Sequence, residues 1–321
     1  MEKLTVICPV YNEEHYISDV LNFFLSAQPP SKELILVDGG SSDRTVEIIN
    51  RYISANPNIK LLSNPDKFVP YALNMAITAS TGDPVVRLDA HTKYHKDYFV
   101  AILECFSRTG ADIVGGPMRA QGTTPLQLAV AYATSTPLGV GDSGFHDATK
   151  EGFTESVYLG AWRRSIFETT GMFDTEMLRN QDDEFHYRAR KAGFTVYLDP
   201  AIKSTYYPRN SIIKLFSQYF QYGLFKPLVL KKVHTGLRLR HLIPSAFVLY
   251  LASFPLAFIN LWWFSPFCLY LLLICLFAVK SNLSITSRFL LFIIYPALHI
   301  SYGSGFLKGL ILLISGRKPS I

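Results

Sequence analysis

The chain has 321 residues and a formal net charge of +6 at pH 7, and 49% of its residues are hydrophobic. This length allows two ordinary domains. The four cysteines have no spacing typical of a metal site or of a disulfide framework, which indicates buried thiols in a reducing compartment.

Strand and helix patterns alternate through about the first 115 residues. Apolar runs predict strands at residues 4–8, 33–37, 59–62, 85–88 and 112–114. Helical patterns lie between them at residues 14–27, 44–54, 70–79 and 96–107. This alternation predicts an α/β fold in which helices cover both faces of a parallel sheet. Ligands bind such sheets beyond the carboxyl ends of the strands.

Polar clusters follow three of these strands. The first strand ends in Pro9-Val10-Tyr11-Asn12-Glu13, the second in Asp38-Gly39-Gly40-Ser41-Ser42-Asp43 and the fourth in Asp89-Ala90-His91. A turn or a helix cap explains each cluster taken alone. Because all three follow strands of one sheet, together they predict a nucleotide pocket.

Asp89 and His91 face the same way, since they stand two residues apart, and His95 follows His91 after about one helical turn. A metal site, a hydrolytic site and a surface turn are all consistent with this spacing. A zinc hydrolase is disfavoured because no third ligand stands at a matching distance. His95 is expected to be dispensable.

Charge and hydropathy change after Asp199, the last acidic residue, which 13 Lys and Arg residues follow. An anionic partner is therefore expected, and hydropathy favours a membrane over nucleic acid. Residues 242–279 carry no charge, and a single span needs only about 20 residues. We expect a hairpin broken at residues 260–266, with Trp262 and Trp263 at the interface and both basic flanks in the cytoplasm.

A third apolar stretch, residues 289–314, is interrupted by Pro296, His299 and Lys308. It is consistent with a third span, a re-entrant pair or an interfacial helix, and two spans plus an interfacial segment are the preferred interpretation. The first strand begins directly after Met1-Glu2-Lys3, so we expect the N-terminal domain to stay cytosolic.

Five motifs in sequence order resemble the family 2 glycosyltransferases over about residues 3–226. They are Ile7-Cys8-Pro9-Val10-Tyr11-Asn12-Glu13, then Val37 to Thr45, then Asn64 with Tyr71-Ala72-Leu73-Asn74, then Gly160 to Arg164 with Gly171 to Asp174, and last Asn180 to Phe185. His91 stands where the family usually has the third position of Asp-x-Asp. That pattern resembles the succinoglycan-type exopolysaccharide branch, whose members carry C-terminal membrane segments.

The resemblance implies a GT-A nucleotide-sugar-binding, Rossmann-like domain followed by membrane helices. We expect this cytosolic domain at residues 1–226, with an amphipathic interfacial helix at about 210–226. A basic juxtamembrane linker at 227–241 and a membrane region at 242–315 would follow. The expected location is the inner (plasma) membrane, multi-pass, with the catalytic domain in the cytoplasm.

The implied activity is metal-dependent, inverting hexosyl transfer in polysaccharide biosynthesis, with Mg²⁺ or Mn²⁺ as cofactor. The donor is a nucleotide diphosphate sugar, with UDP-glucose as the first choice, and the acceptor a polyprenyl-diphosphate-linked saccharide. A polyprenyl-phosphate sugar synthase is the alternative enzyme. The non-enzymatic alternative is a membrane-anchored binding or scaffolding protein, and loss of Asp38, Asp89 or Asp182 would have favoured it.

Site residues are carried over from the motifs. The nucleotide contacts are Pro9, Tyr11, Glu13, Asp38, Asn74 and Asp89. Asp89 would hold the metal, and His91 would either ligate it or bond a phosphate oxygen or a metal-bound water. The general base is Asp182, which follows Gln181 where the family usually has Glu, and Asp183 is the alternative. The acceptor or its diphosphate would contact Arg163, Asp183, Arg209, Gln218 and Tyr222.

Overall fold

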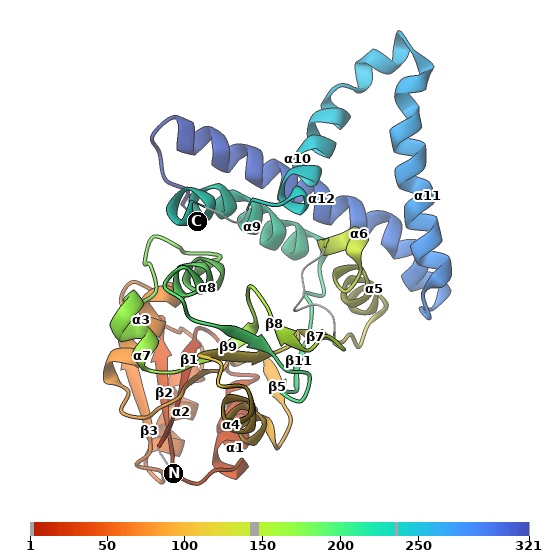
Figure 1. Cartoon of the computed structure of the whole chain (residues 1–321). Coiled ribbons are helices and arrows are strands. Elements are labelled where there is room, and N and C mark those ends of the chain that lie inside the picture. Colours follow the sequence, from red (N-terminus) through yellow and green to blue (C-terminus); the bar gives the residue numbers. More distant parts are fainter. Residues whose placement is uncertain (1–2, 142–147, 235–236, 321) are drawn as a thin grey trace. The chain divides into compact units, whose positions relative to one another are not determined.

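The computed structural model describes residues 3–141, 148–234 and 237–320. The chain divides into two compact units (Figure 1). The first unit consists of two segments, one that ends at Arg119 and one that ends at Tyr206. The second unit consists of the segment that begins at Ala120, between those two, and of the chain from Tyr207 onward.

An eight-stranded sheet, counted over the described residues, forms the centre of the first unit, in the order β3-β2-β1-β4-β9-β6-β10-β8. Its strands are β1 (Leu4–Val10), β2 (Lys32–Asp38), β3 (Ile59–Ser63), β4 (Val85–Arg87), β6 (Ile113–Gly116), β8 (Gly152–Phe153), β9 (Tyr158–Trp162) and β10 (Val196–Leu198). The five strands expected from the sequence are confirmed within three residues at each end.

The sheet is mixed: the five strands expected in the first 115 residues run in one direction, as expected, and the strands that reverse direction, β8 and β9, lie outside that region. Strands β1 to β4 are parallel to one another, and so are β6 and β10. Strand β9 lies between β4 and β6 and runs antiparallel to both. The amino end of β9 therefore lies at the edge where β4 and β6 have their carboxyl ends.

Alternating side chains of each strand enter two separate cores. From β1, Val6 and Cys8 pack into one core and Ile7 packs into the other, as the period of two requires. Helices α1 (Ile17–Ser26), α2 (Thr45–Ile53) and α4 (Tyr98–Thr109) cover the first core, and α3 (Val69–Ala79), α7 (Ser165–Thr170) and α8 (Gln181–Lys191) cover the second (Figure 1). Helix α8 is thereby fixed over the sheet by Phe185 and Ala189.

A small three-stranded sheet, within the part of the chain that the structure describes, adjoins β4. Its order is β5 (Thr92–Tyr94), β11 (Ser204–Tyr206) and β7 (Arg119–Ala120). Strand β5 follows β4 after four residues and pairs antiparallel with β11. The connection from Leu88 to His91 is therefore held at both ends by a sheet.

Glu33 is a buried carboxylate at the start of β2, with 1% of its surface exposed. It accepts hydrogen bonds from Lys3 Nζ at 2.9 Å, Thr5 Oγ1 at 2.9 Å and the Thr81 N–H at 2.7 Å. Burial raises the pKa of Glu33, but these hydrogen bonds outweigh it and bring the pKa to about 2.

The second unit is helical in the part that is described. Its elements are α5 (Pro125–Thr134), α6 (Pro137–Val140), α9 (Ile212–Val233), α10 (Leu239–Ala252), α11 (Ser265–Lys280) and α12 (Ile285–Ile314), with 3₁₀ turns η2 (Phe254–Phe258) and η3 (Leu261–Phe264). Helix α9 runs unbroken through the boundary expected at residue 226, and its last turns take up residues 227–233 of the expected linker. The units therefore divide at different positions from those expected.

Helices α5, α9, α11 and α12 share one core, which explains why α5 belongs to this unit. Ala129 and Val130 of α5 pack with Leu215, Ile274 and Leu291. Tyr132 Oη donates to the Phe277 carbonyl at 2.8 Å. The segment that contains α5 was expected in the catalytic domain, but its apolar side chains are buried here against the C-terminal helices.

Two close approaches join α9 to α12. A Cβ atom at Gly223 would overlap the backbone of Tyr302, and one at Gly305 would overlap the backbone of Phe220. The two helices can pack this closely because both positions lack a side chain.

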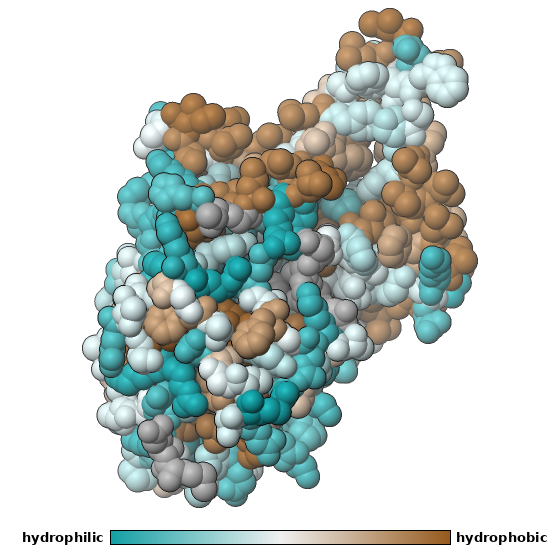
Figure 2. Space-filling view, in the orientation of Figure 1, coloured by the Kyte–Doolittle hydropathy of each residue, from teal (hydrophilic) through white to brown (hydrophobic). Residues whose placement is uncertain are grey.

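Two helical stretches in the described residues are long and apolar enough to cross a membrane. They are Leu261–Lys280 and Ile285–Ile314, and within an apolar 18-residue window of each, 11% of the first and 50% of the second is buried. Figure 2 shows hydrophobic residues gathered along α11. These helices support membrane association.

The expected hairpin is corrected in one respect. Helix α10 has 14 residues, so it is about 21 Å long, less than the ~30 Å of a bilayer core. The third apolar stretch instead forms part of one continuous helix, α12, despite Pro296 within it. The two candidate spans are therefore the second arm of the expected hairpin and the third stretch.

Candidate active site

Strands β1, β2 and β4 end at one edge of the sheet, where a cleft opens. Val10 pairs with Asp38, and Ile7 pairs with Arg87, so the chain leaves all three strands at the same edge. The cleft is lined by Pro9, Val10, Tyr11, Glu13, Val37, Gly39, Asn64, Lys67, Val69, Ala72, Arg87, Asp89, Ala90 and His91. A cleft thus lies at the edge where the nucleotide pocket was expected, and five of the expected contact residues line it.

Hydrogen bonds join the loops that follow β1 and β2. The Asn12 N–H donates to Ser41 Oγ at 2.9 Å, and the Ser42 N–H donates to Asn12 Oδ1 at 2.8 Å. The Glu13 N–H donates to Thr45 Oγ1 at 2.7 Å. Asn12 has a φ of 55°, a left-handed conformation that asparagine tolerates better than most residues. This network fixes the backbone from which Tyr11 and Glu13 line the cleft.

Asp38 shapes the second loop. Its carboxylate accepts hydrogen bonds from the Gly40 N–H at 3.0 Å and from Ser41 Oγ at 2.6 Å. The neighbouring Gly39 lines the cleft, and a Cβ atom there would lie 3.1 Å from the Lys67 carbonyl oxygen. Only glycine lets these two backbones approach so closely without displacement. Asp38 was expected to contact a nucleotide base, and that role remains a proposal.

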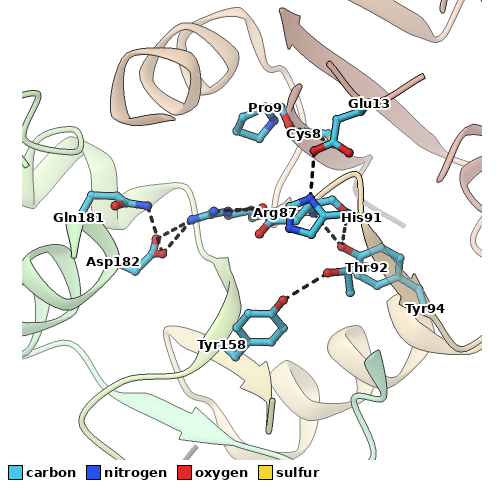
Figure 3. A network of polar contacts seen from close by, with 11 residues as sticks. Cys8, Pro9, Glu13, Arg87, His91, Thr92, Tyr94, Tyr158, Gln181 and Asp182 are labelled. Atoms are coloured by element: carbon cyan, nitrogen blue, oxygen red, sulfur yellow. Dashed lines mark hydrogen bonds and ion pairs between the residues drawn. The ribbon is translucent and has the colours of Figure 1, made fainter. Parts of the chain in front are cut away.

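Arg87 joins two carboxylates that the sequence placed in separate motifs, Asp89 and Asp182, and Figure 3 shows its contact with Asp182. Its Nε donates to Asp89 Oδ1 at 3.0 Å. Its Nη1 donates to the two carboxylate oxygens of Asp182 at 2.9 and 2.8 Å. Burial lowers the pKa of Arg87, but the charges of Asp182 and Asp89 outweigh burial and raise it above its usual value. The guanidinium therefore stays charged.

Asp182 lies in the first turn of α8, on a layer that covers the sheet. Its side chain is 35% exposed, whereas that of Arg87 is 9% exposed. The next acidic residue but one, Glu184, instead pairs with Arg188 of the same helix at 2.8 Å. The contact with Arg87 thus directs the Asp182 carboxylate toward the end of β4.

His91 lies opposite Glu13 on the cleft (Figure 3). Its Nδ1 is 3.0 Å from Glu13 Oε1. A proton on Nδ1 that is donated to this carboxylate leaves Nε2 as the nitrogen with a lone pair, which is the usual arrangement behind a metal-bound histidine. Glu13 thus orients the ring from behind.

The donor atoms on this cleft fit one kind of metal site. The described residues contain no group of three His, Cys, Asp or Glu side chains that could hold an ion. Asp89, His91 and His95 are described residues, and they form no such group. A cation with few protein ligands and several phosphate oxygens, as is typical of Mg²⁺ with a nucleotide, needs only a carboxylate such as Asp89. His91 adds a nitrogen that Mn²⁺ accepts readily.

Two expected site residues have other partners. Asn74 Nδ2 donates to the Phe173 carbonyl at 2.8 Å, and the Phe173 N–H donates to Asn74 Oδ1 at 2.9 Å. Its amide therefore holds the segment before α8 and is not among the residues that line the cleft. Arg163 follows β9, which runs antiparallel to β4, so it leaves the sheet at the edge opposite the cleft. There its guanidinium stacks 4.5 Å from the ring centre of Phe106.

Arg209, Gln218 and Tyr222 belong to the second unit. Arg209 is exposed and precedes α9. Gln218 Nε2 donates to Tyr222 Oη at 2.8 Å, one turn along α9. Their expected acceptor contacts remain proposals, as does the secondary role of Asp183.

Sequence reasoning missed Arg87, Tyr94 and Tyr158. Tyr94 Oη accepts from the Asp89 N–H at 2.7 Å and donates to the Asp89 carbonyl at 3.0 Å. Tyr158 Oη lies 3.2 Å from Thr92 Oγ1. Burial and the charge of Asp89 raise the pKa of Tyr158 well above its usual value, so its hydroxyl stays protonated. Arg87 could have been found, since it shares a strand face with Asp89, but no sequence signal indicates Tyr158.

Comparison with known proteins gives consistent matches. Residues 5–171 match the family model described as glycosyl transferase family 2. The succinoglycan biosynthesis protein ExoA of Rhizobium meliloti is 31% identical over 256 residues, which cover 79% of this chain and 76% of that protein. A Methanococcus voltae dolichyl N-acetyl-alpha-D-glucosaminyl phosphate 3-beta-D-2,3-diacetamido-2,3-dideoxy-beta-D-glucuronosyltransferase is 29% identical, over 97% of this chain and 98% of that protein.

Two solved structures share the fold. The mannosyltransferase PcManGT from Pyrobaculum calidifontis, in complex with GDP-Man and Mn²⁺, superimposes with a TM-score of 0.67 at 18% identity, over 96% of this chain and 87% of that chain. Staphylococcus aureus TarS 1-349 in complex with UDP-GlcNAc gives a TM-score of 0.53 at 15% identity, over 98% and 92%.

Proposed function

We propose, from the premise that this chain belongs to glycosyl transferase family 2, that it is a membrane-bound, metal-dependent, inverting hexosyltransferase. It would move a sugar from a nucleotide diphosphate sugar to a polyprenyl-diphosphate-linked saccharide in polysaccharide biosynthesis. UDP-glucose is the first donor to test.

One observation carries the proposal: Arg87, which lines the cleft, bonds both Asp89 and Asp182. Glycosyl transfer needs a group that receives the leaving diphosphate and a group that takes the acceptor's proton. Asp89 lies among the residues of the nucleotide cleft, and Asp182 lies at the start of a covering helix. The carboxylates that the two motifs supply are thus held by one side chain.

The donor end of the cleft suits a nucleotide diphosphate. The Gly39 backbone and the side chain of Lys67 line it, and Lys67 can face the phosphate charge. Asp89 would hold the cation, with His91 as a second ligand or as a donor to phosphate. A bound Mg²⁺ or Mn²⁺ supplies the positive charge that stabilises the departing diphosphate.

Asp182 would take the proton of the acceptor hydroxyl as that oxygen attacks the anomeric carbon. The new glycosidic bond forms as the bond to the diphosphate breaks, so the configuration inverts. The contact with Arg87 favours Asp182 over Asp183 for this role, since it fixes the Asp182 carboxylate at the end of β4.

The second unit would receive the lipid-linked acceptor and anchor the enzyme. No acidic residue follows Asp199, so the 13 Lys and Arg residues after it give this part of the chain a net positive charge, which would attract anionic lipid headgroups. Arg209 is the first choice for a diphosphate contact, with Gln218 and Tyr222 nearby on α9. The names of the relatives support such an acceptor, because one concerns succinoglycan and another a dolichyl phosphate saccharide. We place the enzyme in the plasma membrane with its first unit in the cytoplasm.

A donor screen tests the proposal. Purified protein in membrane extract is supplied with a panel of radiolabelled nucleotide sugars and Mg²⁺ or Mn²⁺, and label in the lipid fraction is counted. Label should transfer from one donor and should stop when a chelator is added. Transfer that persists with excess chelator would refute the metal-dependent mechanism. The absence of transfer from every donor would refute the proposed glycosyltransferase activity.

A further inference from the structure

Arg87 lies where two layers of the first unit meet. It is the last residue of β4, a strand buried between β1 and β9, and 7% of its surface is exposed. Asp89 follows it on the same strand face, whereas Asp182 reaches it from α8, 95 residues away. One guanidinium thus connects the sheet to the first turn of the covering helix.

The segment before Asp182 has an irregular backbone. Asn180 has a φ of 60°, and Gly171 has a φ of 76°. This segment is held from outside by the Asn74 clamp on Phe173 and by Arg188, whose Nη2 donates to the Met172 carbonyl at 2.9 Å. Neither contact reaches the carboxylate of Asp182.

The carboxylate of Asp182 has few partners of its own. Besides Arg87, Gln181 Nε2 lies 3.4 Å from Oδ2, a long hydrogen bond. More than a third of the side chain is open to solvent, where several rotamers would otherwise be accessible. Arg87 is therefore the contact in the described structure that sets the direction of this carboxylate.

We infer that Arg87 is a positioning residue that aims the Asp182 carboxylate at the acceptor hydroxyl and holds it in register with Asp89. This inference rests on the proposed roles of Asp182 and Asp89. Arginine suits the task because its planar fork can serve two carboxylates at once, which the single ammonium of lysine does less well. Its charge is also permanent at physiological pH.

A double-mutant cycle tests this role, because a residue that acts through another has no further effect once that other is removed. The turnover number is measured at saturating donor and cation for the wild type, Arg87→Gln, Asp182→Asn and the double variant. Misplacing a reacting group by about 1 Å can cost about 10²-fold. Arg87→Gln should therefore lower kcat by about 10²-fold, yet in the Asp182→Asn background it should lower kcat by less than about twofold.

Arg188→Gln is the matched control. Arg188 also pairs with a carboxylate of α8 and holds the same segment, but its partner is Glu184. Its loss in kcat should be the same factor in both backgrounds, as for an independent structural contact. If Arg87→Gln behaves like this control, Arg87 only supports the fold and the inference is wrong.

Two further outcomes are informative. Thermal unfolding in detergent checks each variant, and if Arg87→Gln does not fold, the cycle is run with Arg87→Lys, which keeps the buried charge. If Asp182→Asn alone keeps full activity, the base assignment fails and the role of Arg87 fails with it. If Asp182→Asn lowers kcat and Arg87→Gln lowers it by the same factor in both backgrounds, the role inferred for Arg87 is overturned, whereas the assignment of Asp182 as the base stands.

Discussion

Asp182→Asn separates folding from chemistry, and the structure indicates how large each effect should be. The amide keeps one oxygen for Arg87 Nη1, so one of the two contacts at 2.9 and 2.8 Å survives. A lost hydrogen bond to a charged group costs about 1.5–3 kcal/mol when buried, and less at this partly exposed side chain. One fewer carboxylate in the first turn of α8 costs about 0.3–1 kcal/mol. The free energy of unfolding of a typical domain is about 5–15 kcal/mol, so the fold should persist.

The chemical effect of the same substitution should be much larger. A general base contributes about 10²- to 10⁴-fold, so turnover should fall by at least the lower figure while donor affinity stays nearly constant. Turnover is followed by release of nucleoside diphosphate, and donor affinity by calorimetry with a non-transferable analogue. Asp183→Asn is the control and should be milder, because Asp182 remains. If Asp183→Asn shows the larger loss in turnover and Asp182→Asn the milder one, Asp183 is the base. If both variants keep full turnover, the base is another residue.

Three further predictions concern the metal, the membrane and stability. Asp89→Ala should abolish transfer, whereas His91→Ala should raise the Mn²⁺ concentration needed for half-maximal activity without abolishing it; equal losses would contradict their different roles. Because α11 and α12 are the two candidate spans and the first unit is proposed to be cytoplasmic, single cysteines placed in the 281–284 loop between these helices, with the native cysteines replaced, should be labelled by an impermeant thiol reagent in intact cells; protection of this loop would contradict the two spans. The pKa of Glu33 is about 2 in the folded protein, below its usual 4.5, so ionised Glu33 contributes roughly 3 kcal/mol to the free energy of unfolding. This contribution should be complete above pH 4.5 and should be lost as the pH falls toward 2. Urea unfolding across this range should lose that pH dependence in Glu33→Gln, and an unchanged profile would contradict the account.

The sequence predicted the first half of the sheet well because its signals are local. Strands β1 to β4 are short apolar runs, and glycine and aspartate mark the turns after them. The direction of β9 was not predictable in this way. It depends on a strand that returns to the middle of the sheet after about 40 residues, and no local pattern specifies which neighbours it finds.

The two compact units divide the chain at other positions than the domains expected from the sequence, and the reason is similar. Helix α5 contains alternating small residues such as Ala129 and Ala133, and these pack equally well against a sheet or a membrane helix. Its partners are set by distant residues of α11 and α12. Helix α9 is continuous through residue 226, although Pro227 lies within it.

At the site, family motifs identified residue types but not all of their partners. Asp89 and His91 line the cleft as expected, and Asp182 stands at the start of a helix as expected. Asn74 stands in a motif position, yet its amide is engaged by Phe173, a contact that spans 99 residues. Arg87 was overlooked because its contact with Asp182 joins residues that lie 95 positions apart in the sequence.

The central claim is that this cleft binds a nucleotide diphosphate through a cation at Asp89. Calorimetry of UDP binding to the purified protein, with and without Mn²⁺, tests it most directly. The account predicts binding that requires Mn²⁺ in the wild type and is lost in Asp89→Ala, while His95→Ala, whose side chain pairs with Asp97 outside the cleft, binds as the wild type does. UDP binding of equal strength in Asp89→Ala, or in the wild type with excess chelator, would contradict it.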